Sequence, residues 1–222
     1  MRRWAGRPLL GTRQGRRRAW GLLTACVVVV LAIGVAFARQ STADGLDRVV
    51  DDPVIRLLGG HAIALYWMEY PGTQVPALVL SLAMAVACLG ARRLNGVVLA
   101  LTAVFVATRF DDSLLKPLFH RTYLGALSYP SGHTTSVVAM IACYVVLFLL
   151  PPQVPKTWPW LLAGLVVLLA LLVVTALGVI GLRWHYFTDV VGGAAVGVAA
   201  VCALCLLLDG AWRWLGLSRG LG

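Results

Sequence analysis

The chain has 222 residues, of which 60% are hydrophobic and 13% charged, and its mean hydropathy is +0.85. This composition excludes an ordinary soluble globular domain and indicates an integral membrane protein. The formal net charge of +10 arises largely in an arginine-rich N-terminal arm beside an apolar run. We therefore expect anionic lipid headgroups, and no nucleic acid, as the partner of this arm.

Six apolar runs follow one another along the chain, separated by charged residues, Pro or clusters of Trp. They cover approximately residues 20–38, 75–91, 95–108, 134–150, 160–182 and 190–208. A run of roughly 20 residues crosses a bilayer as a helix, so the short third run must begin near Leu94 or extend into Phe110. The sequence predicts an all-α fold, a polytopic bundle of six transmembrane helices. The expected parts are a basic arm (1–18), the six-helix membrane domain (19–212) and a C-terminal tail (213–222).

The basic residues predict the orientation, because Lys and Arg in short loops remain on the cytoplasmic side of a membrane. Counting the loops alternately, 12 of the 19 Lys and Arg residues fall on the side of the N-terminus. These 12 are Arg2, Arg3, Arg7, Arg13, Arg16, Arg17, Arg18, Arg92, Arg93, Lys156, Arg213 and Arg219. Of the nine acidic residues, only Asp209 falls on that side. Both termini are therefore expected in the cytoplasm of a multi-pass protein of the cell membrane.

Three segments before the second run allow more than one interpretation. The first run is also compatible with a signal peptide cleaved after residues 36–38, although its length and the following Arg39 favour a retained span. Residues 44–58 mix apolar and charged side chains, which predicts a surface helix broken at Pro53. The stretch 66–72 is typical of an aromatic belt at the membrane interface. We interpret the last two as anchors.

The first motif with chemical content is Pro130-Ser131-Gly132-His133, directly before the fourth run. A glycine permits close approach of the backbone to a ligand, and the first turn of a helix offers free N–H groups to an anion. Ser131 adds a hydroxyl, and an imidazole such as that of His133 protonates a leaving oxygen near neutral pH. The alternative is that Ser131 only caps the helix and His133 faces water.

The second motif pairs His185 with Asp189, between the fifth and sixth runs. If this segment is helical, residues four apart share a face. A carboxylate that binds one ring nitrogen fixes the tautomer and leaves the other nitrogen free to attack phosphorus. The alternative is a simple ion pair at the membrane interface.

Two cations, Arg109 and Lys116, lie in the same outer loop as the first motif. Since phosphoryl transfer depends on charge stabilisation, these side chains are candidates for holding a phosphate, although each also fits an ordinary surface charge. No metal-binding motif occurs, and the single pair Cys202-x-x-Cys205 lies inside an apolar run, so no metal or cofactor is expected. The loops after the third and fifth runs face the same side, which favours one shared site.

These motifs resemble those of the type 2 phosphatidic acid phosphatases, whose pattern is K-x6-R-P, then P-S-G-H, then S-R-x5-H-x3-D. The second motif matches fully, and the third retains His185 and Asp189 at the right separation. The resemblance implies that His185 is the nucleophile, His133 the general acid and Asp189 the orienting carboxylate. It further implies a phosphate-binding set: Arg109, Lys116, Ser131 and Gly132.

The chain departs from this family pattern in two places. Arg109 and Lys116 exchange the order of the family's Lys and Arg, with Pro117 in register. The family's Ser-Arg pair falls on Gly178 and Val179, so one phosphate-binding cation is missing. Arg183 is a candidate substitute, because it would lie one helical turn beyond Val179 on the same face.

The resemblance implies an integral membrane lipid phosphatase that works without a metal through a phosphohistidine intermediate at the outer membrane face. Its substrate would be a phosphomonoester or a diphosphate of a lipid. A polyprenyl diphosphate is favoured by the resemblance, with phosphatidate-type lipids as the other class. Two alternatives remain open: a phosphotransferase that uses a lipid or sugar acceptor, and a non-catalytic lipid-binding membrane protein of the same fold.

Overall fold

The computed structural model describes residues 8–150 and 158–214. Within these ranges, six helical segments are long and apolar enough to cross a membrane, which confirms the predicted all-α bundle of six transmembrane helices. Part of the predicted basic arm (1–7) and most of the C-terminal tail (215–222) lie outside the described residues. So do five of the basic residues used to predict the orientation: Arg2, Arg3, Arg7, Lys156 and Arg219.

Three of the spans are single helices, namely α1 (Arg13–Ala36), α8 (Trp158–Gly181) and α9 (Phe187–Trp214). The second span combines α3 (Ala62–Glu69), the 3-10 turn η2 (Tyr70–Gly72) and α4 (Gln74–Gly90). The third combines α5 (Leu94–Phe110), the π-helical turn η3 (Asp111–Leu115) and α6 (Lys116–Phe119). The fourth consists of α7 (Gly132–Tyr144) and η4 (Val145–Leu149). Outside the spans lie α2 (Leu46–Leu58) and a hairpin of β1 (Thr122–Tyr123) and β2 (Ala126–Leu127).

The spans are longer than the apolar runs that predicted them. The third begins at Leu94 and continues through Phe110, as its required length demanded, and then extends to Phe119. Helix α1 begins at Arg13, inside the predicted basic arm. Polar and charged residues therefore continue both helices beyond the apolar core of the membrane.

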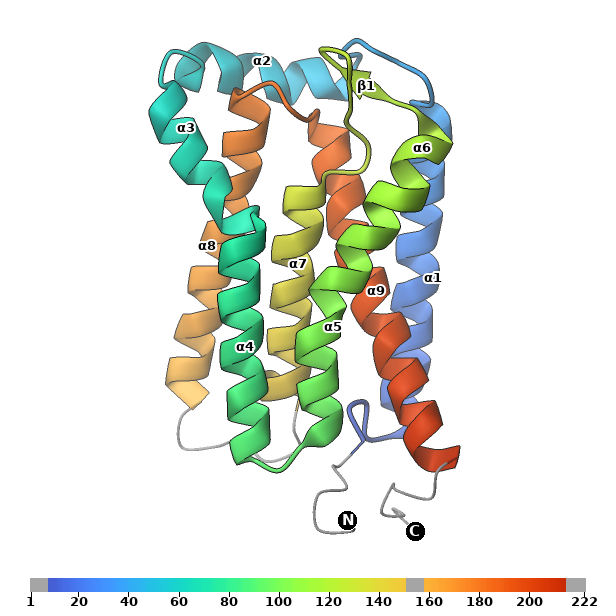
Figure 1. Cartoon of the computed structure of the whole chain (residues 1–222). Helices are drawn as coiled ribbons and strands as arrows, with labels where there is room; N and C mark the ends of the chain where they lie inside the picture. The colour runs from blue at the N-terminus through green and yellow to red at the C-terminus, as the bar shows by residue number, and fades with distance from the viewer. Residues whose placement is uncertain (1–7, 151–157, 215–222) are drawn as a thin grey trace.

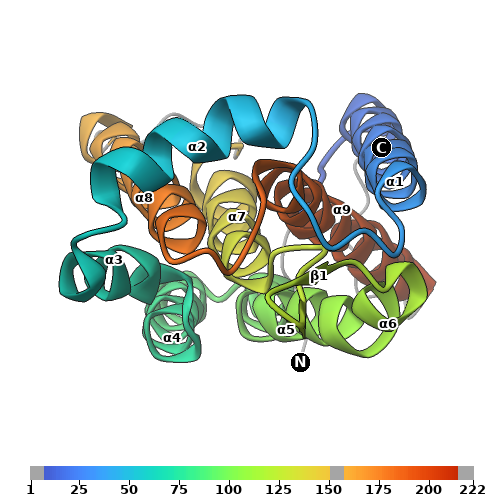
Figure 2. The ribbon, with the colours of Figure 1, turned by 90° about the horizontal axis from the view of Figure 1, so that it is seen from above.

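The spans run side by side, with α2 lying across the end that carries α3, α6 and the hairpin (Figure 1). We call this the upper end. The start of α1 and the end of α9 lie together at the opposite, lower end (Figure 1). Seen from above, α7 occupies the centre of the bundle (Figure 2), and it packs on α4, α5, α8 and α9. Every residue from Thr134 to Ile141 in α7 is buried.

Glycines of α9 bring its backbone close to the central helix. A methyl group added at Gly197 would lie 2.8 Å from the carbonyl oxygen of Thr135. Such small residues permit tight packing of transmembrane helices, where the hydrophobic effect contributes little to their association. The start of α7 and the start of α9 are therefore held together at the upper end.

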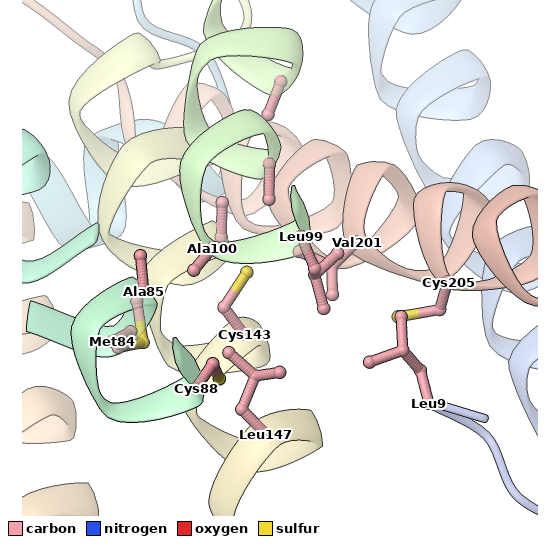
Figure 3. Packing of buried hydrophobic residues seen from close by; sticks show 13 residues of the cluster. Leu9, Met84, Ala85, Cys88, Leu99, Ala100, Cys143, Leu147, Val201 and Cys205 are labelled. Carbon is pink, nitrogen blue, oxygen red and sulfur yellow. The ribbon is translucent and has the colours of Figure 1, made fainter. Parts of the chain in front are cut away.

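At the lower end, a hydrophobic cluster joins α4, α5, α7 and α9 (Figure 3). Three of the five cysteines, Cys88, Cys143 and Cys205, are buried in it as free thiols, which pack there as small apolar side chains. Leu9 packs against the same cluster, and its backbone N–H donates to Asp209 Oδ1 over 2.7 Å. The segment before α1 is thus tied to the end of α9.

The prediction that Pro53 breaks the surface helix is wrong. Helix α2 continues through Pro53, although a proline inside a helix costs about 3 kcal/mol. The helix is held on both sides of the proline, because Asp47 and Asp51 precede it with bonds to α9, and Val54 after it packs on α8 and α9. These tertiary contacts outweigh the lost backbone hydrogen bond.

Candidate active site

Two histidines meet at the upper end of the bundle. His133 is the second residue of α7, and His185 lies in the turn between α8 and α9. The centroids of their rings are 6.0 Å apart, and the ring of Trp184 lies 5.7 Å from that of His133. The structure therefore brings the two predicted motifs, which are 52 positions apart in the chain, to one place.

His185 is oriented by a backbone carbonyl. Its Nδ1 lies 2.8 Å from the carbonyl oxygen of Ser128, and the side chain is almost completely buried. A carbonyl oxygen only accepts hydrogen bonds, so Nδ1 carries a proton, and in the neutral ring Nε2 then has a free lone pair. This is the tautomer that a histidine nucleophile needs.

The predicted geometry of Asp189 is wrong in one respect. Helix α9 begins at Phe187, so His185 and Asp189 are not successive turns of one helix. Asp189 Oδ2 instead accepts the backbone N–H of Tyr186 over 2.9 Å and lies 3.8 Å from His185 Nδ1, beyond hydrogen-bond distance. The carboxylate thus acts on His185 by charge, while Ser128 makes the hydrogen bond.

The start of α7 and the start of α6 carry Ser131, Gly132 and Lys116, three of the residues predicted to bind phosphate. Ser131 is the N-cap of α7, where its Oγ accepts from Thr134, as one interpretation of the sequence expected. A methyl group added at Gly132 would lie 3.8 Å from Lys116 Nζ, so the ammonium faces the first turn of α7. Lys116 also forms an ion pair of 2.7 Å with Asp112. Backbone N–H groups and one ammonium thus converge at this point.

Among the described residues, neither Arg109 nor Arg183 forms a hydrogen bond or an ion pair with this cluster. Arg109 is exposed on α5, with its guanidinium 5.2 Å from the centroid of the Phe105 ring. The helical argument for Arg183 is wrong, because α8 ends at Gly181 and Arg183 adopts a left-handed conformation with φ of 59°. Its exposed side chain therefore does not continue the helical face of Val179.

The departure of the third motif from the family pattern has a packing reason. Helix α3 lies directly on α8 at Gly178, where an added methyl group would be 2.7 Å from the backbone nitrogen of Glu69. The next residue, Val179, is completely buried against Val190 and Phe187. The two positions where the family has Ser and Arg therefore serve packing in this chain, Gly178 between α8 and α3 and Val179 between α8 and α9.

One carboxylate at the site was not predicted. Glu69, at the end of α3, places Oε2 at 3.0 Å from His133 Nε2 and is largely buried. In the sequence, Glu69 falls within the stretch 66–72, which is typical of an aromatic belt. The available signal was a single acidic residue within an otherwise apolar and aromatic stretch, which is rare unless it has a partner.

A buried arginine beneath the site was also missed. Arg121 is completely buried, and its guanidinium donates to Asp47, Thr188 and Asp189 over 2.5 to 2.6 Å. It lies between two aromatic rings, with centroids at 4.5 Å for Phe37 and 4.2 Å for Tyr186. This network, the Arg121 network, fixes Asp189 and joins α2 to the first turn of α9.

The Arg121 network contains two carboxylates and one guanidinium, and a third carboxylate, that of Asp51, lies close to it. Burial, reinforced by the nearby charge of Asp47, raises the pKa of Asp51 to about 7. Its Oδ1 accepts the backbone N–H of Phe187 over 3.1 Å, and its Oδ2 has no hydrogen-bond partner among the described residues. Asp51 is therefore more easily protonated in the folded protein than in the unfolded chain.

We expect the free energy of unfolding of the wild-type protein to decrease as the pH rises from about 4 to about 7. In this range the folded state holds the Asp51 proton and the unfolded state does not. Asp51→Asn keeps an acceptor for Phe187 and removes the titration, so it should flatten this part of the curve. Thermal unfolding in detergent across this pH range measures the effect. An unchanged slope in Asp51→Asn would contradict the assignment.

Among the described residues, no group of three or more His, Cys, Asp or Glu side chains is arranged to hold a metal ion. Asp111, which is adjacent to Asp112, is buried and accepts from Thr135 Oγ1 over 2.8 Å.

The comparisons with known proteins agree with the motifs. Residues 77–213, more than half of the chain, match the model of the PAP2 superfamily. This region runs from the first turn of α4 to the end of α9 and contains both His133 and His185. Searches of curated proteins and of solved structures gave no match. With its six spans and its paired histidines at the upper end, the chain belongs to the PAP2 superfamily, as the motif resemblance predicted.

Proposed function

We propose that the protein is a lipid phosphatase in which His185 attacks the phosphorus atom and His133 protonates the leaving oxygen. Members of the PAP2 superfamily are generally phosphatases. The observation that carries the proposal is the pair of imidazoles 6.0 Å apart, of which one has a free Nε2 lone pair. Two such rings reach opposite sides of one phosphoryl group.

In the first step, a bond forms between His185 Nε2 and phosphorus while the bond from phosphorus to the leaving oxygen breaks. A proton held by His133 passes to that leaving oxygen. In the second step, water attacks the phosphohistidine, and His133 takes a proton from this water, which restores both imidazoles and releases phosphate. Lys116 and the first N–H groups of α7 stabilise the charge on the other phosphate oxygens.

The position of the site supports a membrane lipid as substrate. The histidines lie at the ends of two spans, so that a phosphate headgroup meets them from water while the lipid tail stays in the bilayer. The distribution of basic residues supports an extracytoplasmic location for this upper end, with both termini cytoplasmic. The site requires no metal or cofactor in this mechanism.

The proposal is tested with purified full-length protein in detergent and a panel of lipid phosphates that includes a phosphatidate and a prenyl diphosphate. We expect release of inorganic phosphate and, after rapid quenching with labelled substrate, an acid-labile phosphoprotein. Protein that releases no phosphate from any member of the panel would contradict the proposal. Label that passes to an added alcohol without release of phosphate would indicate transfer in place of hydrolysis.

Lys116→Ala should lower kcat/KM by roughly 100-fold, because this ammonium faces the helix start where the phosphate is expected to bind. Arg109→Ala should change kcat/KM much less, since its guanidinium stacks on Phe105 and the side chain is exposed. Arg183→Ala tests the substitute cation suggested by the sequence. Steady-state kinetics on one lipid phosphate ranks the three variants, and equal losses for Lys116→Ala and Arg109→Ala would contradict this placement.

A further inference from the structure

Glu69 contacts the candidate general acid, and the mechanism above does not use it. Its Oε2 lies 3.0 Å from His133 Nε2, at ion-pair distance but without the geometry of a hydrogen bond, and this oxygen has no hydrogen-bond partner among the described residues. A carboxylate oxygen and a bare imidazole lone pair repel each other at this distance. The contact is therefore favourable only when one of the two groups carries a proton.

The fold places Glu69 there through two close backbone approaches. A methyl group added at Gly72 would lie 2.8 Å from His133 Cβ and 2.9 Å from the His133 carbonyl oxygen. On the other side, Gly178 admits the backbone of Glu69 itself. The corner between α3 and η2 is thus pressed between α7 and α8, which fixes the carboxyl group against the imidazole.

The other charges around His133 oppose a proton on an isolated imidazole. Burial of the ring and the positive charge of Lys116 both raise the energy of an imidazolium at this position. Asp112 favours a proton on His133, but it is exposed and already forms an ion pair with Lys116. Glu69 is the acid in direct contact with the ring, so it lets the pair keep one proton without a net positive charge.

We infer that Glu69 and His133 jointly hold the proton for the leaving oxygen, and that this pair fits the site to phosphate monoesters of a lipid alcohol rather than to lipid diphosphates. The inference rests on the proposed phosphatase function. Glu69 is a positioning residue in this scheme, because it acts through His133.

The leaving group explains the preference. Cleavage of a monoester expels an alkoxide, a strong base that needs a proton as the bond from phosphorus to oxygen breaks. The proton passes from the pair to that oxygen, which leaves a neutral alcohol next to the Glu69 carboxylate. Cleavage of a diphosphate expels a lipid phosphate, which is a weak base and carries its own negative charge. The proton then contributes little, so the pair gives the cleavage of a diphosphate no comparable help.

The test compares a short-chain phosphatidate with farnesyl diphosphate, using purified full-length protein in detergent. We expect wild-type protein to have the higher kcat/KM on the phosphatidate. Glu69→Gln keeps the size of the side chain but holds no transferable proton, so it should lower kcat on the phosphatidate by on the order of 100-fold. Turnover of farnesyl diphosphate should change by less than about threefold or increase.

The controls separate catalysis from folding. Glu69→Asp restores a carboxyl group and should recover part of the phosphatidate activity. Asp52→Asn removes an exposed carboxylate at the same end of the bundle and should leave both activities unchanged. The alkaline limb of the pH profile for the phosphatidate should move to lower pH in Glu69→Gln, which a purely structural role of Glu69 would not cause.

Three results would overturn the inference. They are a wild-type preference for the diphosphate, equal losses on both substrates in Glu69→Gln, and an unshifted pH profile in that variant. In these cases the wild-type protein still releases phosphate, and the proposed function stands. Wild-type protein that hydrolyses neither substrate would instead overturn the proposed function together with the inference.

Discussion

Arg121→Met should destabilise the folded protein by about 3–5 kcal/mol, because it removes the cation between two buried carboxylates. Methionine fills much of the same volume between Phe37 and Tyr186, so the loss reflects charge and hydrogen bonds more than a cavity. Asp47 and Asp189 would then face each other across an apolar gap with no compensating charge. Thermal unfolding in detergent should show a fall in Tm on the order of 10 °C.

Two further variants check the origin of this effect. Arg48→Met removes an exposed arginine of α2 and should leave Tm nearly unchanged. Adding Asp47→Asn to Arg121→Met removes one of the uncompensated carboxylates and should recover part of the lost stability. If Arg121→Met and Arg48→Met melt at the same temperature, the buried network does not stabilise the fold.

His185→Ala should abolish phosphate release, with a fall in kcat on the order of 10⁴-fold or more, because it removes the proposed nucleophile. The free Nε2 has no substitute among the described residues near His133. The substitution also removes one hydrogen bond to the Ser128 carbonyl, which contributes only about 1 kcal/mol to stability. The variant should therefore remain folded while it loses both phosphate release and the acid-labile phosphoprotein.

His61→Ala is the matched control for this prediction. His61 is exposed at the start of α3 and forms no side-chain cap. Its loss should leave activity and Tm unchanged. A His185→Ala protein that still forms the labelled intermediate would exclude His185 as the nucleophile and direct attention to His133.

The spans could be predicted from the sequence because a bilayer imposes a continuous apolar length on each helix, and this length is visible in a single sequence. The position of His133 at a helix start followed from local chemistry in the same way, since Ser131 and Gly132 are typical of such a start. The predictions that failed assumed that a helix continues. Arg183 and His185 both fall between the end of α8 and the start of α9, where helical spacing does not apply.

The side chains that were missed are defined by contacts between distant segments. Glu69 meets His133 from 64 positions away, and Arg121 meets Asp47 from 74 positions away. Neither pair has a local pattern, because each depends on how α2 and α3 pack against α7, α8 and α9. A single acidic or basic residue in an apolar setting indicates a buried partner, but only packing shows which one it is.

The Arg121 network also has a consequence for biosynthesis. It draws on Phe37, which follows the first span, and on Thr188 and Asp189, which open the last. A nascent chain therefore cannot close the network until the translocon has released the final hydrophobic segment. His185, the proposed nucleophile, lies in the same late-inserted turn, so an interrupted translation product would lack both the closed network and the complete candidate site.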